Sequence, residues 1–247
     1  MSRVVAIHQP NFFPWPGYFA KIARADVFIF LDAVDYPRSG SGMGSYTNRV
    51  KLNIGGAAQW WGCPVHKLPG KPPIHAVEID RAQPWVKKRL ATLEQSYAKA
   101  PHFKEYQEQV RAWVGLDEAR ISTYNIANVR ALCRELGIGA EFVLQSEIGS
   151  EGASTDLLVD LVRRTGGDTY LAGRGAALQY QEEEKFQAAG IELRYIDFHQ
   201  QSYPQAGTTE FLPGLSMLDA LFNLGAAGAA GWLAACIGTH ETRGADG

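Results

Sequence analysis

The chain has 247 residues, of which 46% are hydrophobic and 20% charged, so disorder throughout the chain is excluded. Its 24 basic and 26 acidic residues leave a formal charge of −2, which argues against bulk attraction to nucleic acid or anionic lipid. The three cysteines, at positions 63, 133 and 236, are widely spaced and odd in number, as is typical of a reducing compartment. We therefore expect a cytoplasmic protein without a signal peptide or a membrane span.

The N-terminal segment predicts a βαβ unit. Residues 3–7 and 27–31 form apolar strands, and residues 18–24 form a helix between them. The first strand runs into HQPNFFPWPGY, where three prolines and a glycine exclude regular structure. Because both strands are continuously apolar, we expect a parallel sheet that helices cover on both faces.

The middle of the chain is less regular, and we interpret residues 39–125 as a lid-like, largely helical elaboration. Its predicted elements are a Gly/Ser-rich loop at 39–45, strands at 46–54 and 60–65, and helices from Pro84 and over 102–114. A further apolar helical face lies around residues 126–136.

The last third returns to alternating strands and helices. The expected strands are 141–144, 169–172 and 191–198, and the expected helices begin at Ser154 or Thr155, at Gln181 and at Leu215, the last closing at Asn223 to Gly225. Together the elements predict one α/β domain over residues 1–238, with a mainly parallel Rossmann-like sheet and helices on both faces. We expect residues 239–247 to form a frayed tail.

In such a sheet, ligands bind at the carboxyl ends of the strands beside a topological switch point. Three segments follow predicted strands and are expected to converge there, namely residues 8–18, 32–38 and 172–176. Each carries polar residues or glycines directly after an apolar run.

The first segment is the most informative. His8 is the candidate general acid or base, because an ordinary imidazole titrates near neutral pH. Gln9 and Asn11 lie beside it and are candidate substrate-binding residues. Its prolines make the loop rigid, and Gly17 lets the backbone and the following helix N-terminus approach a phosphate or carboxylate. The alternative is that the loop only packs a tight turn.

Acidic and basic residues follow in the second segment and beyond it. Asp32 could orient His8, hold a metal or accept a ribose hydroxyl, or it could simply cap a turn. Arg49 and Lys51 alternate onto one face of a predicted strand, where they could clamp an anion or belong to a solvated edge.

The remaining motifs are weaker. Gly173 ends a strand without a full dinucleotide-binding fingerprint, and Ser216 and Asp219 fit the start of a helix. Cys63 lies near His66 but is more typical of a core thiol than of a nucleophile. The cysteines lack zinc-site spacing, and we predict no metal site.

Several blocks together resemble the WbqC-like family. They are HQPNFFPWPGYF, ADVFIFLDAVDY, the run Tyr46-Thr47-Asn48-Arg49, the run Tyr170-Leu171-Ala172-Gly173, and YPQ followed by FLPGLSMLDALFNLG. The stretch at 39–45 looks longer than is usual in that family, and the Ala/Gly-rich part after Leu224 looks divergent.

The resemblance implies a function in bacterial surface-polysaccharide or O-antigen biosynthesis, or in a specialised metabolic pathway. It implies a transferase that moves an aminoacyl, glycyl or acyl group onto an amino-sugar-like acceptor, with ATP or another phosphate-bearing donor as a possible cosubstrate. By this resemblance the site residues are His8, Gln9, Gly17, Tyr18, Asp32, Asn48, Arg49, Tyr203, Gln205 and Asp219.

A fainter likeness leaves two alternatives open. The strand, His-containing loop and glycine before a helix are similar to the opening of HIGH-type nucleotidylyltransferases, although Tyr18 stands where that pattern has its second histidine. An adenylate-forming or nucleotidyl-transfer enzyme is therefore the second hypothesis. The third is a non-catalytic protein that binds a sugar or nucleotide for a partner enzyme. All three take a small molecule as ligand.

Overall fold

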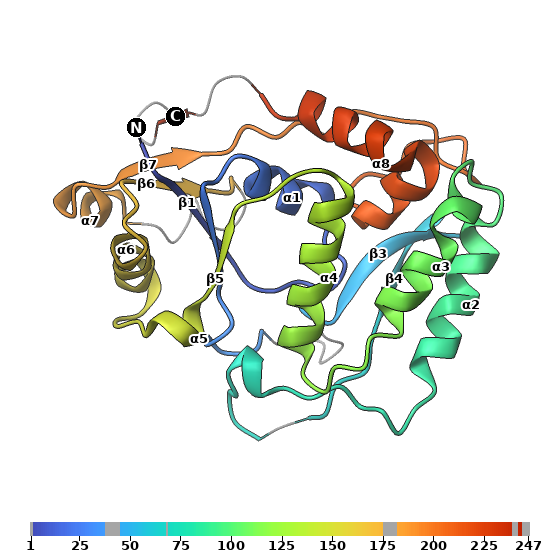
Figure 1. The fold of residues 1–247 in the computed structure, drawn as a ribbon, viewed down its shortest axis with the longest axis horizontal. Helices are drawn as coiled ribbons and strands as arrows, with labels where there is room; N and C mark the ends of the chain where they lie inside the picture. Colours follow the sequence, from blue (N-terminus) through green and yellow to red (C-terminus); the bar gives the residue numbers. More distant parts are fainter. Residues whose placement is uncertain (1, 38–44, 68, 175–181, 239–241, 244–247) are drawn as a thin grey trace.

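The computed structural model describes residues 2–37, 45–67, 69–174, 182–238 and 242–243 (Figure 1). Arg38, the Gly/Ser-rich loop up to residue 44, residues 175–181 and most of the expected tail lie outside the described residues. The strands of the main sheet are β1 (Val4–His8), β2 (Val27–Phe30), β5 (Glu141–Leu144), β6 (Thr169–Ala172), β7 (Glu192–Tyr195) and β8 (Thr242–Arg243).

These six strands form one sheet in the order β5-β2-β1-β6-β7-β8. All neighbours from β5 to β7 are parallel, and only β8 runs antiparallel, against β7. The predicted α/β class with a mainly parallel, Rossmann-like sheet is therefore confirmed. β8 lies within the segment that we expected to fray.

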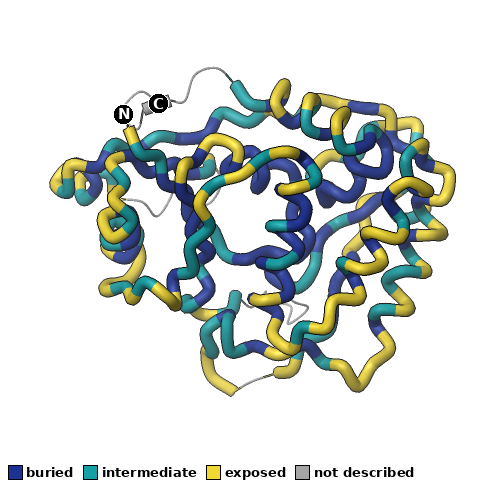
Figure 2. The backbone as a smooth tube through the Cα atoms, viewed as in Figure 1, coloured by how far each residue is buried: buried dark blue, intermediate teal, exposed yellow. Residues whose placement is uncertain are grey.

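Helices cover both faces of this sheet (Figure 1). They are α1 (Pro16–Ala23), α4 (Ile121–Glu135) and α8 (Met217–Cys236) on one face, and α6 (Ser154–Arg164) and α7 (Glu183–Ala188) on the other. Side chains of successive strand residues point to opposite faces, so Ala6 and Phe28 pack in the first core and Val5 and Val27 in the second. The central strands are buried throughout (Figure 2), as their continuous apolar sequences predict.

The middle of the chain forms a hairpin and two further helices. Its elements are β3 (Arg49–Ile54), β4 (Ala57–Gly62), the short helix η1 (Ile74–Ala76), α2 (Trp85–Tyr97) and α3 (Phe103–Val114). β3 and β4 pair antiparallel in a sheet of their own. The predicted strand at 46–54 starts late because residues 46–48 form a turn. The second strand begins at Ala57 and ends at Gly62, so it overlaps its predicted range of 60–65 only at residues 60–62.

Aromatic residues of β4 and α4 pack against the proline-rich loop that follows β1. Phe12 and Phe13 are fully buried against Trp61 of β4 and Tyr124 of α4, with ring centroids 5.0–6.2 Å apart. Phe13 has φ 40°, a left-handed conformation that an aromatic residue rarely adopts. Its carbonyl accepts a hydrogen bond from the Ser216 hydroxyl at 2.6 Å, which holds the strained residue in place.

α8 departs from its predicted end. It continues to Cys236 across a kink at Gly225, whose φ of 70° suits a residue without a side chain. The Ser216 cap is confirmed, because its hydroxyl accepts a hydrogen bond from the Leu218 N–H. Among the described helices, α8 alone has the length and hydropathy of a membrane span, yet 56% of that window is buried inside the protein, as in the core helix of a soluble protein.

The start of α6 and the short helix α5 (Gln145–Ile148) also differ from expectation. Neither Ser154 nor Thr155 caps α6, whose N-cap is Ala153. Thr155 instead accepts a hydrogen bond from the backbone N–H of Glu182, which ties α6 to the segment before α7. Tertiary contact thus replaces the local cap that the sequence pattern indicated.

Candidate functional site

A cavity of about 560 Å³ lies at the carboxyl ends of β1, β6 and β7. From β1 the chain first adds strands on one side, β2 and β5, and then crosses to β6 on the other side. The gap between β1 and β6 is therefore the topological switch point, where open α/β sheets bind ligands. We call this the switch-point cavity; its lining includes His8, Asn11, Trp15, Gly17, Tyr18, Lys21, Tyr46, Gly173, Arg174, Asp197, Phe198 and His199.

The structure brings the first predicted segment and the described start of the third into this cavity. His8 is the last residue of β1, and its Nδ1 lies 3.1 Å from the Gln9 carbonyl oxygen. The Tyr18 hydroxyl donates to the same oxygen at 3.0 Å, and the two rings meet edge to face at 4.7 Å. Since only an N–H can bond to a carbonyl, Nδ1 carries the proton of the neutral ring and Nε2 remains an acceptor.

Lys21 is a lining residue that sequence reasoning missed. It lies one turn after Gly17 in α1, is 6% exposed, and donates from Nζ to the Ile7 carbonyl at 2.9 Å. In the sequence it looks like a solvated lysine on an apolar helix, since nothing local marks it as buried. Its position one helical turn after Gly17 is a signal that it could face the same site, although it does not indicate burial.

Burial sets the charge of both groups. Burial and the nearby Lys21 charge lower the pKa of His8 to about 3, so the imidazole is neutral at physiological pH. Burial also lowers the pKa of Lys21, to about 8, which leaves its ammonium mostly charged at pH 7. The cavity therefore holds a neutral base beside a desolvated cation.

Trp15 explains why residue 17 is glycine. A Cβ built on Gly17 would stand 1.8 Å from Cζ3 of the Trp15 indole, which folds over the start of α1 and packs on Phe198 with ring centroids 6.1 Å apart. Gly17 thus provides space for one wall of the cavity.

We predict that Gly17→Ala displaces the Trp15 indole and raises KM for the substrate more than it lowers kcat. Forcing an added methyl group into a packed site typically costs about 1–3 kcal/mol, and rotation of the indole would relieve part of this. Steady-state kinetics and Trp fluorescence test the prediction, with Gly139→Ala as the control because a Cβ there meets nothing within 4 Å. Unchanged KM would contradict it.

Asp197 and His199 form a second polar pair that sequence reasoning missed. His199 Nε2 lies 2.7 Å from the Asp197 carboxylate, and the His199 side chain is 80% exposed. Both residues follow β7, so the rule that ligands meet strand carboxyl ends would have found them.

Asp32 is not among the lining residues of this cavity. Its carboxylate accepts hydrogen bonds from the Ser146 N–H at 3.0 Å and from the Ser146 hydroxyl at 2.7 Å. Within the described chain, these bonds tie the end of β2 to α5, and none joins Asp32 to His8. Asp32 therefore bonds the first turn of α5, whose N-cap residue is Leu144, and this role is close to the structural alternative for it. Gln9 contributes its carbonyl oxygen, which the His8 ring and the Tyr18 hydroxyl share.

Asn48 and Arg49 line a different cavity, of about 370 Å³, between β4 and the start of α2. Arg49 and Lys51 lie over the ring of Trp60, with the charged groups 4.2 and 5.5 Å from its centroid. The predicted sharing of one strand face by these two cations is confirmed.

Tyr203, Gln205 and Asp219 come together, as expected, but in the core. Asp219 is fully buried, and its carboxylate accepts hydrogen bonds from the hydroxyls of Tyr203 (2.6 Å) and Tyr97 (2.8 Å) and from the Gln205 amide (2.9 Å). Burial raises the pKa of Asp219, and these donors oppose that rise. The network joins α8 to α2 and to the segment before α8.

We predict that Tyr203→Phe lowers the free energy of unfolding by about 1.5–3 kcal/mol, the range for a hydrogen bond to a charged group. Denaturant unfolding at pH 7 measures this, with Tyr46→Phe as the control because the Tyr46 side chain is 47% exposed. Equal stability of Tyr203→Phe and the parent protein would show that the hydroxyl does not hold the network. The KM of the Tyr203→Phe variant for the substrate tests separately whether the hydroxyl contacts the substrate.

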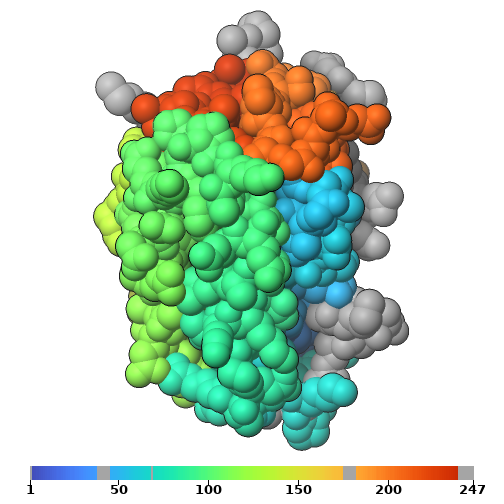
Figure 3. All heavy atoms as spheres, turned by 90° about the vertical axis from the view of Figure 1, so that its right-hand side faces the viewer, coloured from blue at the N-terminus to red at the C-terminus, as the bar shows by residue number. Residues whose placement is uncertain are grey.

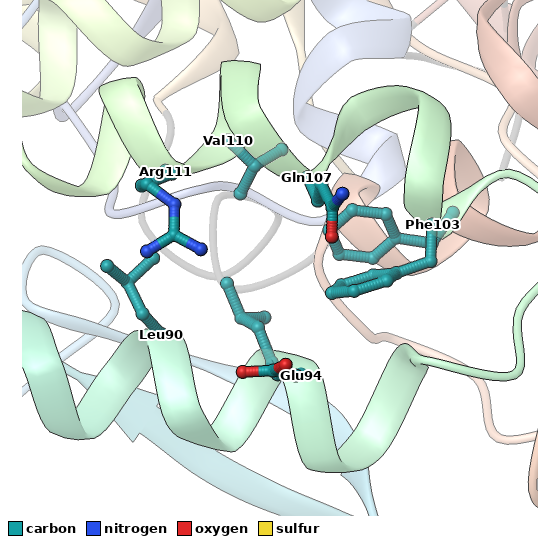
Figure 4. A pocket seen from close by; sticks show the side chains of 8 residues that line it. Leu90, Glu94, Phe103, Gln107, Val110 and Arg111 are labelled. Carbon is teal, nitrogen blue, oxygen red and sulfur yellow. The ribbon is translucent and has the colours of Figure 1, made fainter.

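The other features carry less chemistry. The crevice between α2 and α3, where Leu90 and Glu94 face Gln107 and Arg111 (Figure 4), offers about 40 Å³, which suits water and not a substrate. No group of three or more His, Cys, Asp or Glu side chains in the described part of the chain could hold a metal. Burial raises the pKa of Cys63 to about 12, so it is a neutral core thiol.

Comparison with known proteins decides the family. The model of the WbqC-like protein family matches residues 9–230. The chain belongs to the WbqC-like protein family. It is also similar to the uncharacterized protein Rv1507c of Mycobacterium tuberculosis, with 30% identity over 229 residues, covering 91% of this chain and 95% of that protein. No solved structure gives a significant match. The matched range of the WbqC-like chain includes the loop after His8 and every lining residue of both cavities from Asn11 onward.

Proposed function

We propose that this WbqC-like protein is a cytoplasmic enzyme that transfers an acyl or aminoacyl group to an amine or hydroxyl of a small, sugar-like acceptor in surface-polysaccharide or specialised-metabolite biosynthesis. The observation that carries the proposal is the pairing of neutral His8 with the buried Lys21 cation in one cavity at the switch point. Acyl transfer needs a base for the attacking group and positive charge for the oxygen that becomes negative.

The roles follow from the two charge states. The acceptor's nitrogen or oxygen attacks the donor's carbonyl carbon, and His8 Nε2 accepts the proton that the attacking atom loses. The carbonyl electron pair moves to oxygen, where the Lys21 ammonium stabilises it. Among the described residues Lys21 Nζ bonds only to the Ile7 carbonyl, which leaves two of its three N–H groups for the substrate. When the carbonyl reforms, the leaving group departs with its electron pair and takes the proton from His8.

The size and lining of the cavity support a sugar-sized acceptor. About 560 Å³ lies within the range of small-molecule sites. Trp15, Phe198 and Tyr46 supply aromatic surface for the apolar face of a ring, and Asn11 and Asp197 supply polar groups that could orient hydroxyls.

A thermal-shift screen followed by a turnover assay tests the proposal. Aminosugars, glycine, acyl thioesters, nucleotide sugars and ATP are screened singly and in pairs, because a ligand of the folded state raises the melting temperature. We expect stabilisation by an aminosugar and an acylated product in the presence of a donor. ATP-dependent release of pyrophosphate would instead support nucleotidyl transfer, and binding without any turnover would support the non-catalytic hypothesis.

A further inference from the structure

The cavity beside the switch-point cavity is lined by cations. We call it the Arg49 cavity; its charged lining residues are Arg49 on β3 and Lys88 and Arg89 on α2. The other lining residues are Asn48, Trp60, Gly62, Cys63, Pro64, Gln83 and Trp85, so no carboxylate of the described residues lines it. Figure 3 shows this flank of the molecule, where the light-blue hairpin lies beside the green helices.

None of the three cations forms an ion pair with any other residue in the described ranges. Arg89 donates from Nε to the Gly62 carbonyl, and the Trp61 indole donates to the Arg89 carbonyl at 3.3 Å, so β4 and α2 hold the guanidinium at the cavity wall. Burial lowers the pKa of Arg89, because the surrounding side chains displace part of the water around its guanidinium.

Arg49 is also short of a partner. Its guanidinium stacks on Trp60, and its Nε is buried without a hydrogen-bond partner in the described structure. Arg49 forms no ion pair with a described residue, and it lines the cavity, where the guanidinium can pair with an anion. Arginine presents a planar fork of donors that matches phosphate oxygens.

The start of α2 adds to the positive potential. The helix has no side-chain cap and no acidic residue in its first turn, and its residues Trp85, Lys88 and Arg89 line the cavity. The N-terminus of a helix carries partial positive charge, which complements an anion. Three cations together with this end of the helix match the charge of a diphosphate better than that of a single carboxylate.

An exposed aromatic pair connects the two cavities. Tyr46 lines the switch-point cavity and Trp60 lines the Arg49 cavity, and their rings meet edge to face at 5.5 Å. Both side chains are well exposed, at 47% and 40%. The two rings in contact offer an apolar surface to a ligand that spans both cavities.

We propose that the Arg49 cavity binds the diphosphate group of a substrate whose remaining part lies toward the switch-point cavity. The phosphate site follows from Arg49, Lys88 and Arg89 and from the start of α2. Only the identification of the molecule as the donor rests on the proposed acyl-transfer function.

Calorimetric titration with pyrophosphate at constant ionic strength tests the site. We expect the intact protein to bind it, and we expect Arg49→Gln and Lys88→Gln each to weaken binding by on the order of 10–100-fold, the range for hydrogen bonds to charged groups. Lys87→Gln is the matched control, since Lys87 is exposed on the same helix and outside the cavity, and its affinity should stay within about twofold of the parent's.

Three results would overturn the proposal. They are no binding of pyrophosphate, equal weakening in Lys87→Gln and Lys88→Gln, and binding of citrate as tight as that of pyrophosphate. Circular dichroism of each variant verifies folding, and Lys88→Gln, at an exposed position, keeps the test valid if Arg49→Gln unfolds. Because the titration measures no turnover, pyrophosphate binding with failed acyl transfer would leave the site standing and reject only the proposed function.

Discussion

Replacing His8 with alanine is expected to lower turnover by on the order of 10²-fold, the lower end of the usual contribution of a general base, because a pKa of about 3 makes the imidazole a weaker base than its ordinary value of 6.5 would. The imidazole lines the switch-point cavity, and its Nδ1 is engaged by the Gln9 carbonyl, which leaves Nε2 to accept a proton. Turnover under saturating donor and acceptor measures the loss. Undiminished turnover in a folded His8→Ala protein would reject this role.

His66→Ala is the matched control for this variant. His66 is an exposed histidine outside the switch-point cavity, so its removal should leave turnover unchanged. His8→Gln gives a second comparison, because an amide oxygen accepts a hydrogen bond but does not take up a proton. Loss of activity in both His8 variants would separate proton transfer from hydrogen bonding.

The lowered pKa of His8 also predicts acid sensitivity. In the unfolded chain the imidazole titrates near its ordinary value of 6.5, whereas in the folded protein its pKa is about 3. Between these values the unfolded chain binds the extra proton, so the free energy of unfolding falls as the pH falls. The same variants, His8→Ala and His8→Gln, should lose less stability than the parent in that window.

Lys21→Met is expected to have opposite effects on stability and on turnover. A buried ammonium whose pKa lies at about 8 instead of 10.5 destabilises the folded state by about 3 kcal/mol at pH 7, at about 1.4 kcal/mol per pH unit. Methionine removes that cost but leaves the Ile7 carbonyl without its donor, so we expect a net gain of about 2 kcal/mol. Turnover should fall by on the order of 10²–10³-fold, as when a donor to a developing oxyanion is removed.

The pH dependence of unfolding gives an independent readout. Between about pH 8 and 10.5 the unfolded chain keeps the Lys21 proton and the folded protein does not. The Lys21 contribution to the free energy of unfolding therefore rises with pH across this window, and it should be absent from Lys21→Met. Urea unfolding at pH 7 and at pH 10 compares the two proteins, with exposed Lys87→Met as the control.

The pH dependence of turnover tests the charge that Lys21 carries. If the ammonium stabilises the oxyanion, turnover of the parent enzyme should fall as the pH rises through about 8. A rise through the same pH would show that Lys21 acts as a base and would contradict our assignment. A Lys21→Met protein that is both less stable and less active than the parent would show that Lys21 stabilises the folded state, and would contradict the predicted gain in stability.

Local sequence was enough to predict the frame of the site. The apolar runs of β1, β2 and β6 have no polar alternation, so they had to lie inside a sheet covered on both faces. The strand ends then placed His8 and Gly173 at one edge, because parallel strands end on the same side. Alternation along β3 likewise placed Arg49 and Lys51 on one face.

Long-range packing decided where the polar candidates went. Asp32 and Asp219 have the same local appearance as ligand-binding carboxylates, yet one bonds to Ser146, 114 residues later, and the other to Tyr97, 122 residues earlier. No local pattern distinguishes a carboxylate that caps or anchors the core from one that meets a ligand. The burial of Lys21 is equally invisible without the Ile7 carbonyl beside it.

The sequence by itself determined the α/β class, the family and the proline-rich loop that delivers His8 to a strand end, because these follow from residue type and spacing within short segments. The tertiary structure decided which side chains share a cavity and in which charge state. Lys21 joins His8 only after α1 packs on the sheet, and the Arg49 cavity exists only because β4 lies against α2. Charge and proximity depend on burial by distant segments, and burial is a property of the folded chain.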